Sequence, residues 1–384
     1  MLPSSIPPPP PAAADFGALL ERARRIAADV LAPAANATDQ AEVIPRENLL
    51  ALKGAGLLGL ATPTRYGGHG APGRVAREYT EILAGACGVT AFVQMQHTTG
   101  ACPLIARGEN EALKERVLPR LASGERFCTV GFSHVRRPGP PMVRAELDGD
   151  QVLLDGTVPW LTGHGLADDA VLAGTLPDGR VIFVLSSLRE VEAIQPSPPL
   201  RLCAMNASAT VSLRLRGLRV GREQVIATLT REQQTARDAA GMLAPAALSL
   251  GVAGAAAALL AQAADRRGSA ALASAARGFA GEIDDARAEV NAWADQPEAA
   301  EYGEHAVRAR AWCIELGVRT AHAAVAASGG SANLLEHTAQ RLFREAMLYS
   351  LTAQTRDLQA ATVQRLVGRG EEGRGQSGKR VDPA

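Results

Sequence analysis

The stretch VRAELDGDQVLLDGTV, residues Val143 to Val158, decides the fold class because apolar and polar residues alternate along it. A period of two predicts strands with one buried face. The turn Asp148-Gly149-Asp150 separates the two alternating runs and is typical of a tight hairpin. A second hairpin is predicted in DAVLAGTLPDGRVIFVLSS around Pro177-Asp178-Gly179, and ATVSLRLRGLRV alternates again. Because no helical pattern interrupts these runs, we expect a compact antiparallel sheet or barrel.

Helical periodicity flanks this β segment on both sides. Segments such as FGALLERARRIAADVL and VAREYTEILAGACG space apolar residues by three and four, and the same spacing returns in long alanine-rich segments after residue 231. We therefore expect a mostly α, α+β chain with an N-terminal helical domain (16–126), a β domain (127–228) and a C-terminal four-helix bundle (229–367). The proline-rich arm (1–15) and the glycine-rich, charged tail (368–384) are expected to be disordered.

The composition excludes several classes of function. The chain has 384 residues, 47% of them hydrophobic, and 40 basic residues balance 40 acidic ones. A formal net charge of +0 favours neither nucleic acid nor an anionic membrane as partner. Five scattered cysteines without a CxxC pair indicate free thiols and no metal site, and the N-terminus has no signal-peptide pattern, so we expect a cytoplasmic protein. The stretch LAPAALSLGVAGAAAALLAQAA reaches membrane-spanning length, but alanine and glycine dominate it and suit close packing in a soluble bundle.

The order of helices, sheet and helices, together with several local stretches in the right order, resembles the acyl-CoA dehydrogenase superfamily, which includes flavin-dependent monooxygenases of the same fold. ALKGAGLLGLATPTRYGGHG is similar to the family's N-terminal Tyr-Gly-Gly segment, LLDGTVPWLTG to its Gly-x-Lys-x-Trp-Ile-Thr stretch, and ASGGSANLLEHTAQRLFREA to its Gly-Gly turn followed by Arg-x-x-Arg-Asp. The resemblance implies a flavoprotein oxidoreductase with FAD as cofactor and a small-molecule substrate. It also implies a homodimer or homotetramer, and an electron-transfer partner or a flavin reductase.

The resemblance also implies which residues hold the flavin. Trp160 would pack against the isoalloxazine ring, and Thr162 would hydrogen-bond its pyrimidine edge or N5; an aromatic wall with a few polar groups is what such a ring needs. CTVGFSH stands where the family has a Thr-Glu-Pro loop, and it keeps the hydroxyls of Thr129 and Ser133. Gly329 and Gly330 fit the turn that approaches the adenine end of FAD in a neighbouring subunit.

The chain departs from the family at two places near the expected cofactor. The Glu-Pro and the following Gly-Ser are absent from the loop after Thr129, where Arg136 or Arg137 either pairs with a diphosphate or lies in solvent. The family's Arg-x-x-Phe-Gly stretch is not recognisable in DRRGSAALASAARGFAG. This second departure puts the half of the FAD site that crosses between subunits in doubt.

The family's catalytic carboxylate has no counterpart in the sequence. Aligning REAMLYSLTAQTRDLQ with the family's Tyr-Glu-Gly-Thr segment puts Ala353 at the usual position, and the alternative position falls near Gly241. An alanine or a glycine cannot remove a proton from the α-carbon of a thioester. A slip of four residues would bring Asp238 or Asp357 to these positions.

Three functions stay open on these residues. The first is oxidation of an acyl thioester or similar substrate with an atypical or relocated base such as Asp357. The second is a two-component flavin-dependent monooxygenase that takes reduced FMN or FAD as a diffusible co-substrate. His97, Ser133 and His134 would then lie near the flavin. His97 lies in an apolar helical segment, however, and this pattern is also typical of a histidine in the protein core. The third is a catalytically inactive binding or assembly homologue.

Overall fold

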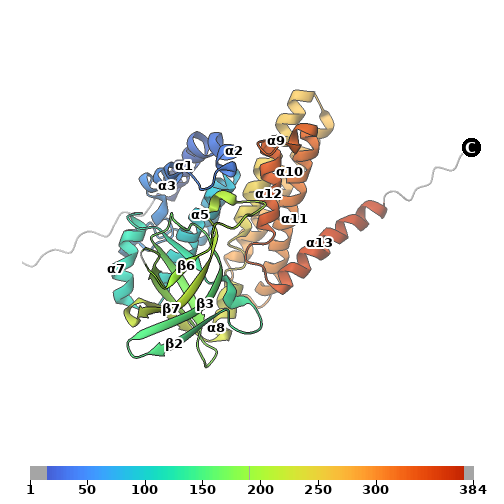
Figure 1. Cartoon of the computed structure of the whole chain (residues 1–384). Coiled ribbons are helices and arrows are strands. Elements are labelled where there is room, and N and C mark those ends of the chain that lie inside the picture. The colour runs from blue at the N-terminus through green and yellow to red at the C-terminus, as the bar shows by residue number, and fades with distance from the viewer. Residues whose placement is uncertain (1–14, 190, 376–384) are drawn as a thin grey trace, which may run out of the picture.

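The computed structural model describes residues 15–189 and 191–375, arranged as helices, a sheet and helices in chain order. Figure 1 shows the N-terminal helices above and beside the sheet, and the long C-terminal helices standing next to both. The predicted fold class, mostly α with a central sheet and C-terminal helices, is confirmed. The domain boundaries predicted from the sequence stay a proposal; the sheet segment itself runs from Cys128 to Leu229.

The N-terminal block is helical and holds two π-helical segments, η1 and η4. Its first helix begins where the carboxylate of Asp15 accepts a hydrogen bond from the N–H of Ala18 at 2.9 Å. The helices are α1 (Phe16–Ile26), η1 (Ala27–Leu31), α2 (Ala32–Gln40), α3 (Arg46–Gly54), η2 (Leu57–Gly59), η3 (Thr64–Tyr66), α4 (Gly73–Ala86), α5 (Gly88–Met95), η4 (Gln96–Ala101), α6 (Cys102–Ala106) and α7 (Glu111–Ala122).

The sheet has eight strands, and most neighbours run antiparallel. The strands and short helices are β1 (Cys128–Gly131), η5 (Ser133–Arg136), β2 (Val143–Asp148), β3 (Gln151–Leu161), β4 (Asp169–Thr175), β5 (Val181–Ser187), β6 (Ile194–Pro196), η6 (Asn206–Ser208), β7 (Val211–Gly221), η7 (Arg222–Gln224) and β8 (Val225–Leu229). The strand order is β6-β7-β3-β2-β4-β5-β8, and β1 pairs with β4. Both predicted hairpins are present, as β2–β3 and β4–β5. The parallel pairing of β1 with β4 differs from the purely antiparallel expectation, because β1 enters the sheet from a helix rather than from a hairpin turn.

The C-terminal block consists of α8 (Arg231–Ala240), α9 (Ala246–Arg267), α10 (Ala270–Ala294), α11 (Tyr302–Ser328), η8 (Gly329–Asn333), α12 (Thr338–Tyr349) and α13 (Arg356–Gly375). A two-residue turn, Gly268-Ser269, joins α9 to α10, and Gly268 adopts a left-handed conformation (φ +58°) that favours glycine. The hairpin of α9 and α10 projects beyond the rest of the molecule in Figure 1.

The terminal segments predicted to be disordered fall largely outside the described residues, namely 1–14 and 376–384. The prediction differs from the structure where α13 continues to Gly375, because the glycines of this segment did not end the helix.

α9 is the one described helix that is long and apolar enough to cross a membrane, and 67% of its most apolar window is buried inside the protein. Its small side chains pack against α4, α10 and α11.

Candidate functional site

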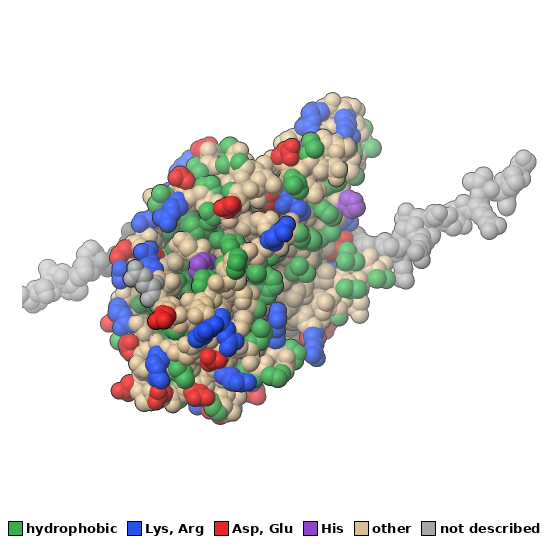
Figure 2. Space-filling view, viewed as in Figure 1, with side chains coloured by type: hydrophobic (Ala, Val, Ile, Leu, Met, Phe, Trp, Pro, Cys, Tyr) green, Lys and Arg blue, Asp and Glu red, His purple; other side chains and the backbone are tan. Residues whose placement is uncertain are grey.

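The site expected from the sequence begins at the C-terminal end of β3, where Trp160 leaves the sheet. The register between β3 and β7 shifts between Val158 and Leu161. Pro159 lies in this irregularity and has no N–H to donate to the ladder. The bulge breaks the alternation of buried and exposed residues, so that Leu161 is buried while Trp160 is 45% exposed. The indole therefore presents an open aromatic surface. Figure 2 shows apolar side chains gathered along the seam between the sheet and the C-terminal helices.

Three buried, hydrogen-bonded hydroxyls form a chain that begins at Thr162, two residues after Trp160. The Oγ1 atoms of Thr162 and Thr210 are 3.0 Å apart, and Thr210 Oγ1 is 2.7 Å from Ser208 Oγ. Three hydroxyls carry three protons, and these two hydrogen bonds use two of them. Thr162 is the most exposed of the three at 7%, so the remaining proton can point outward most readily at Thr162. Sequence reasoning missed Ser208 and Thr210; the Ser-x-Thr spacing in NASAT was the available signal.

Thr129 lies next to Thr162, but its hydroxyl already donates a hydrogen bond within the protein. Its Oγ1 donates to the backbone carbonyl of Thr162 at 2.6 Å, and the side chain is fully buried in β1. The single hydroxyl proton is therefore used inside the protein, in a hydrogen bond to the Thr162 backbone. Ser133 is exposed at the start of η5, and its hydroxyl has no hydrogen-bond partner among residues 15–189 and 191–375.

His97 is a fully buried core histidine. Its Nδ1 accepts from the N–H of Cys128 at 3.0 Å, and its Nε2 donates to the carbonyl of Leu121 at 3.1 Å. The ring also stacks on Phe127, with ring centroids 4.8 Å apart. Burial lowers the pKa of His97 to about 4, so the imidazole is neutral at neutral pH. Both ring nitrogens are occupied, and this geometry supports the core interpretation rather than a catalytic one.

His134 also points into the protein. Its Nε2 donates to the carbonyl of Ala173 at 3.1 Å, and only 4% of the residue is exposed. Burial lowers the pKa of His134 to about 4. Its Nδ1 is also buried, and it has no hydrogen-bond partner among the described residues. The expected role near a flavin therefore finds no support in its position.

No carboxylate occupies either position where the family's base was expected. Ala353 lies exposed in the turn between α12 and α13 with φ +49°, and Gly241 is exposed at the end of α8. Asp238 is paired with Arg136 at 2.8 Å, which also removes Arg136 as a free partner for a diphosphate. Asp357 is exposed in the first turn of α13. The carboxylate of Asp238 is thus committed to an ion pair, and that of Asp357 faces solvent.

The Gly-Gly turn lies at the end of α11, next to an arginine that sequence reasoning missed. Gly329 has φ +71°, and a Cβ added to it would lie 3.7 Å from Nη2 of Arg267. A Cβ on Gly330 would meet open space. Arg267 therefore lies next to the turn that is expected to face the adenine end of FAD. It belongs to the stretch DRRGSAALASAARGFAG, in which the family motif is not recognisable. The described residues contain no cluster of three or more potential metal ligands.

Comparison with known proteins shows which proteins this chain is similar to. Residues 14–125 match the acyl-CoA dehydrogenase N-terminal domain. The probable acyl-CoA dehydrogenase FadE25 of Mycobacterium tuberculosis is 29% identical over 210 residues, which are 53% of this chain and 54% of that protein. The match thus spans about half the length of this curated relative.

Two solved structures share the whole fold. Butyryl-CoA dehydrogenase from Megasphaera elsdenii superposes with a TM-score of 0.81 at 19% identity, over 92% of this chain and 98% of that one. Dibenzothiophene monooxygenase (TdsC) from Paenibacillus sp. A11-2 superposes with a TM-score of 0.76 at 17% identity, over 91% and 97%. At these identities the likeness shows the fold alone. Residues 14–125 thus match an acyl-CoA dehydrogenase N-terminal domain, and the chain as a whole shares the fold of these two structures.

Proposed function

We propose that the protein is an FAD-dependent oxidoreductase of the acyl-CoA dehydrogenase type. One observation carries this proposal: the bulge at the end of β3 exposes the Trp160 ring two residues before Thr162, whose hydroxyl is buried. An aromatic ring that covers one face of a ligand, next to one well-positioned hydroxyl, suits a flat, partly polar ring system. Bound flavin would supply the redox chemistry by accepting or donating a hydride.

Four of the described residues fit such a cofactor. Trp160 would cover part of the ring, and the unused proton of the hydroxyl chain would be donated by Thr162. Thr129 would hold the Thr162 backbone in place through its 2.6 Å hydrogen bond. Ser133 would offer a further exposed hydroxyl close to β1.

The substrate we propose is an acyl thioester or a similar small molecule, oxidised with a base other than the family's usual glutamate. Dehydrogenation removes one proton and one hydride from adjacent carbons, so a group must accept the proton. Ala353 and Gly241 cannot do so, and His97 has both nitrogens occupied. Asp357 is exposed in the first turn of α13, and we propose its carboxylate as the relocated base.

The second candidate is a two-component flavin-dependent monooxygenase. The alanine at position 353 favours it, because this chemistry needs no carboxylate there, and TdsC shows that the fold accommodates a monooxygenase. In this case reduced FMN or FAD, supplied by a flavin reductase, would bind as a diffusible co-substrate. The first candidate would instead pass electrons to an electron-transfer partner.

We further propose a homodimer or homotetramer in which Arg267, Gly329 and Gly330 of one subunit approach the adenine end of FAD bound to another. The proximity of Arg267 to Gly329 supports this arrangement, since a guanidinium pairs well with a diphosphate. A cytoplasmic location is consistent with the free thiols of Cys87, Cys102, Cys128, Cys203 and Cys313.

The absorbance spectrum of the purified protein tests these proposals. A yellow protein whose flavin band is bleached anaerobically by an acyl-CoA supports the dehydrogenase. A colourless protein that binds reduced flavin and then consumes oxygen supports the monooxygenase. Absence of flavin binding in both redox states would contradict both and leave a binding or assembly protein. Light scattering with size-exclusion chromatography gives the number of subunits independently of flavin.

A further inference from the structure

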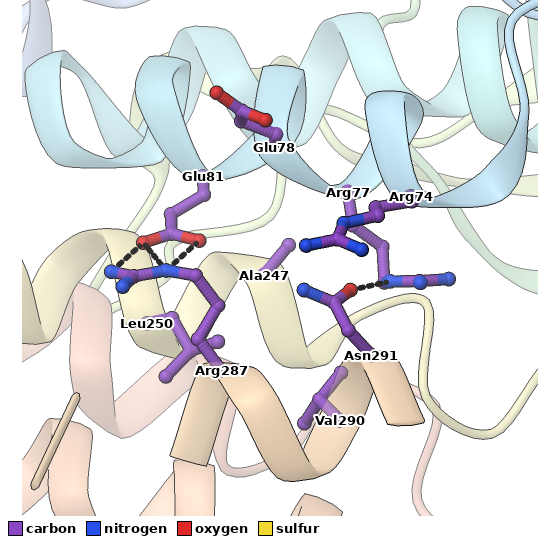
Figure 3. Close-up of a pocket in the computed structure, with 9 residues that line it drawn as sticks. All are labelled: Arg74, Arg77, Glu78, Glu81, Ala247, Leu250, Arg287, Val290 and Asn291. Carbon is purple, nitrogen blue, oxygen red and sulfur yellow. Dashed lines mark hydrogen bonds and ion pairs between the residues drawn. The ribbon is translucent and has the colours of Figure 1, made fainter. Parts of the chain in front are cut away.

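A small pocket lies between α4, α9 and α10, on helices that carry none of the residues assigned to the flavin site except Arg267 at the far end of α9. Its internal volume is about 80 Å³. Figure 3 shows that charged side chains from α4 and α10 face one another across it, above an apolar floor. The lining residues are Arg74, Arg77, Glu78, Glu81, Ala247, Leu250, Arg287, Val290 and Asn291.

Both carboxylates of this pocket already have cationic partners. Glu81 accepts from Nε and Nη2 of Arg287 at 2.7 to 3.1 Å, through both of its oxygens. Glu78 accepts from Nη2 of Arg24 at 2.5 Å and points away from the pocket in Figure 3. The pocket therefore offers no carboxylate that would balance a further cation.

The remaining polar groups of the pocket are donors. Nε of Arg77 donates to Oδ1 of Asn291 at 2.9 Å, which leaves the Asn291 amide nitrogen free to face the pocket. Nη2 of Arg77 also lies 3.4 Å from Asp295. Arg74 has no ion pair among the described residues, and Figure 3 shows its guanidinium turned into the pocket above the Asn291 amide nitrogen. Burial lowers the pKa of Arg77, and the charge of Arg74 lowers it further, while Asp295 opposes both effects.

We propose that this pocket binds a small oxyanion, a carboxylate or a phosphate, between the guanidinium of Arg74 and the amide nitrogen of Asn291. A guanidinium presents paired N–H donors that match two oxygens of such a group, and charge-assisted hydrogen bonds of this kind are the stronger ones. Arg77 is a positioning residue, because its hydrogen bond fixes which end of the Asn291 amide faces the pocket. The apolar floor of Ala247, Leu250 and Val290 limits the ligand to a small group. The proposal does not depend on flavin binding.

Calorimetric titration of the full-length protein with sodium phosphate and with sodium acetate tests the site, at an ionic strength held constant with sodium chloride. We expect saturable binding of at least one oxyanion. Arg74→Gln should weaken it at least tenfold, whereas Arg74→Lys should retain part of the affinity as a point charge. Asn291→Asp should also weaken it at least tenfold, because it keeps the acceptor for Arg77 but replaces the free amide nitrogen with a negative oxygen.

The matched control is Arg144→Gln, because Arg144 is an exposed arginine of β2 without an ion pair in the described part of the chain; it should leave binding unchanged. Binding of phosphate alone or of acetate alone supports the site and identifies which oxyanion it takes. If neither oxyanion binds more tightly than chloride, or if Arg74→Gln and Asn291→Asp bind as the wild type does, the proposal is wrong. Thermal unfolding of each variant establishes that it is folded.

Discussion

Thr210→Val tests whether the hydroxyl chain of Thr162, Thr210 and Ser208 positions Thr162 for a cofactor. Valine has nearly the shape of threonine, so the change removes the hydrogen bonds of 3.0 and 2.7 Å without opening a cavity. Each lost bond costs about 0.5–1.5 kcal/mol, so we expect the free energy of unfolding to fall by about 1–3 kcal/mol. The free Thr162 hydroxyl can then turn away from the ligand. Because that contact is worth about one hydrogen bond, the Kd for FAD should rise roughly 2- to 13-fold.

Fluorescence quenching of FAD by the apoprotein measures this Kd, and denaturant unfolding measures the stability. Thr210→Ser is the matched control, since it keeps a hydroxyl at the same place and should bind FAD as the wild type does. Ser208→Ala removes only the far end of the chain and should have a smaller effect. If Thr210→Val is destabilised but binds FAD with the wild-type Kd, the chain is a structural feature and the reasoning about Thr162 is wrong.

Three further changes test other parts of the structure. Trp160→Ala should abolish flavin retention with little change in stability, because the ring is 45% exposed, and Trp160→Phe should restore part of it; an alanine variant as yellow as the wild type would refute the stacking role. Glu345→Gln leaves buried Arg341 without the carboxylate now 2.9 Å away, and should lower the free energy of unfolding by about 3–5 kcal/mol in denaturant titrations. Because burial lowers the pKa of His97 and of His134 from 6.5 to about 4, the unfolded chain takes up their protons first, so stability should be lost as the pH falls from 6.5 toward 4. Imidazole NMR signals of these residues that titrate near pH 6.5 would contradict this.

The fold could be predicted from the sequence because its signals are local. The hairpins around Gly149 and Gly179 follow from alternation on either side of a turn, and the flanking helices from their spacing of apolar residues. The exposure of Trp160 also has a local cause, since Pro159 interrupts the ladder beside it. What the sequence could not predict was the pairing of β1 with β4, which joins segments about forty residues apart.

The chemistry of the candidate site was decided by tertiary structure. The sequence by itself determined the order of helices, sheet and helices, and it placed His97, Thr129 and Thr162 in segments expected near a flavin. Only the folded chain brings the Thr129 hydroxyl to the Thr162 carbonyl, 33 residues on, and the Thr162 hydroxyl to Thr210, 48 residues on. Only the folded chain surrounds His97 with partners from Leu121 and Cys128, which makes a histidine expected near the flavin a neutral core residue. Periodicity fixes which face of an element is buried, but a hydrogen-bond partner comes from whichever distant segment packs there.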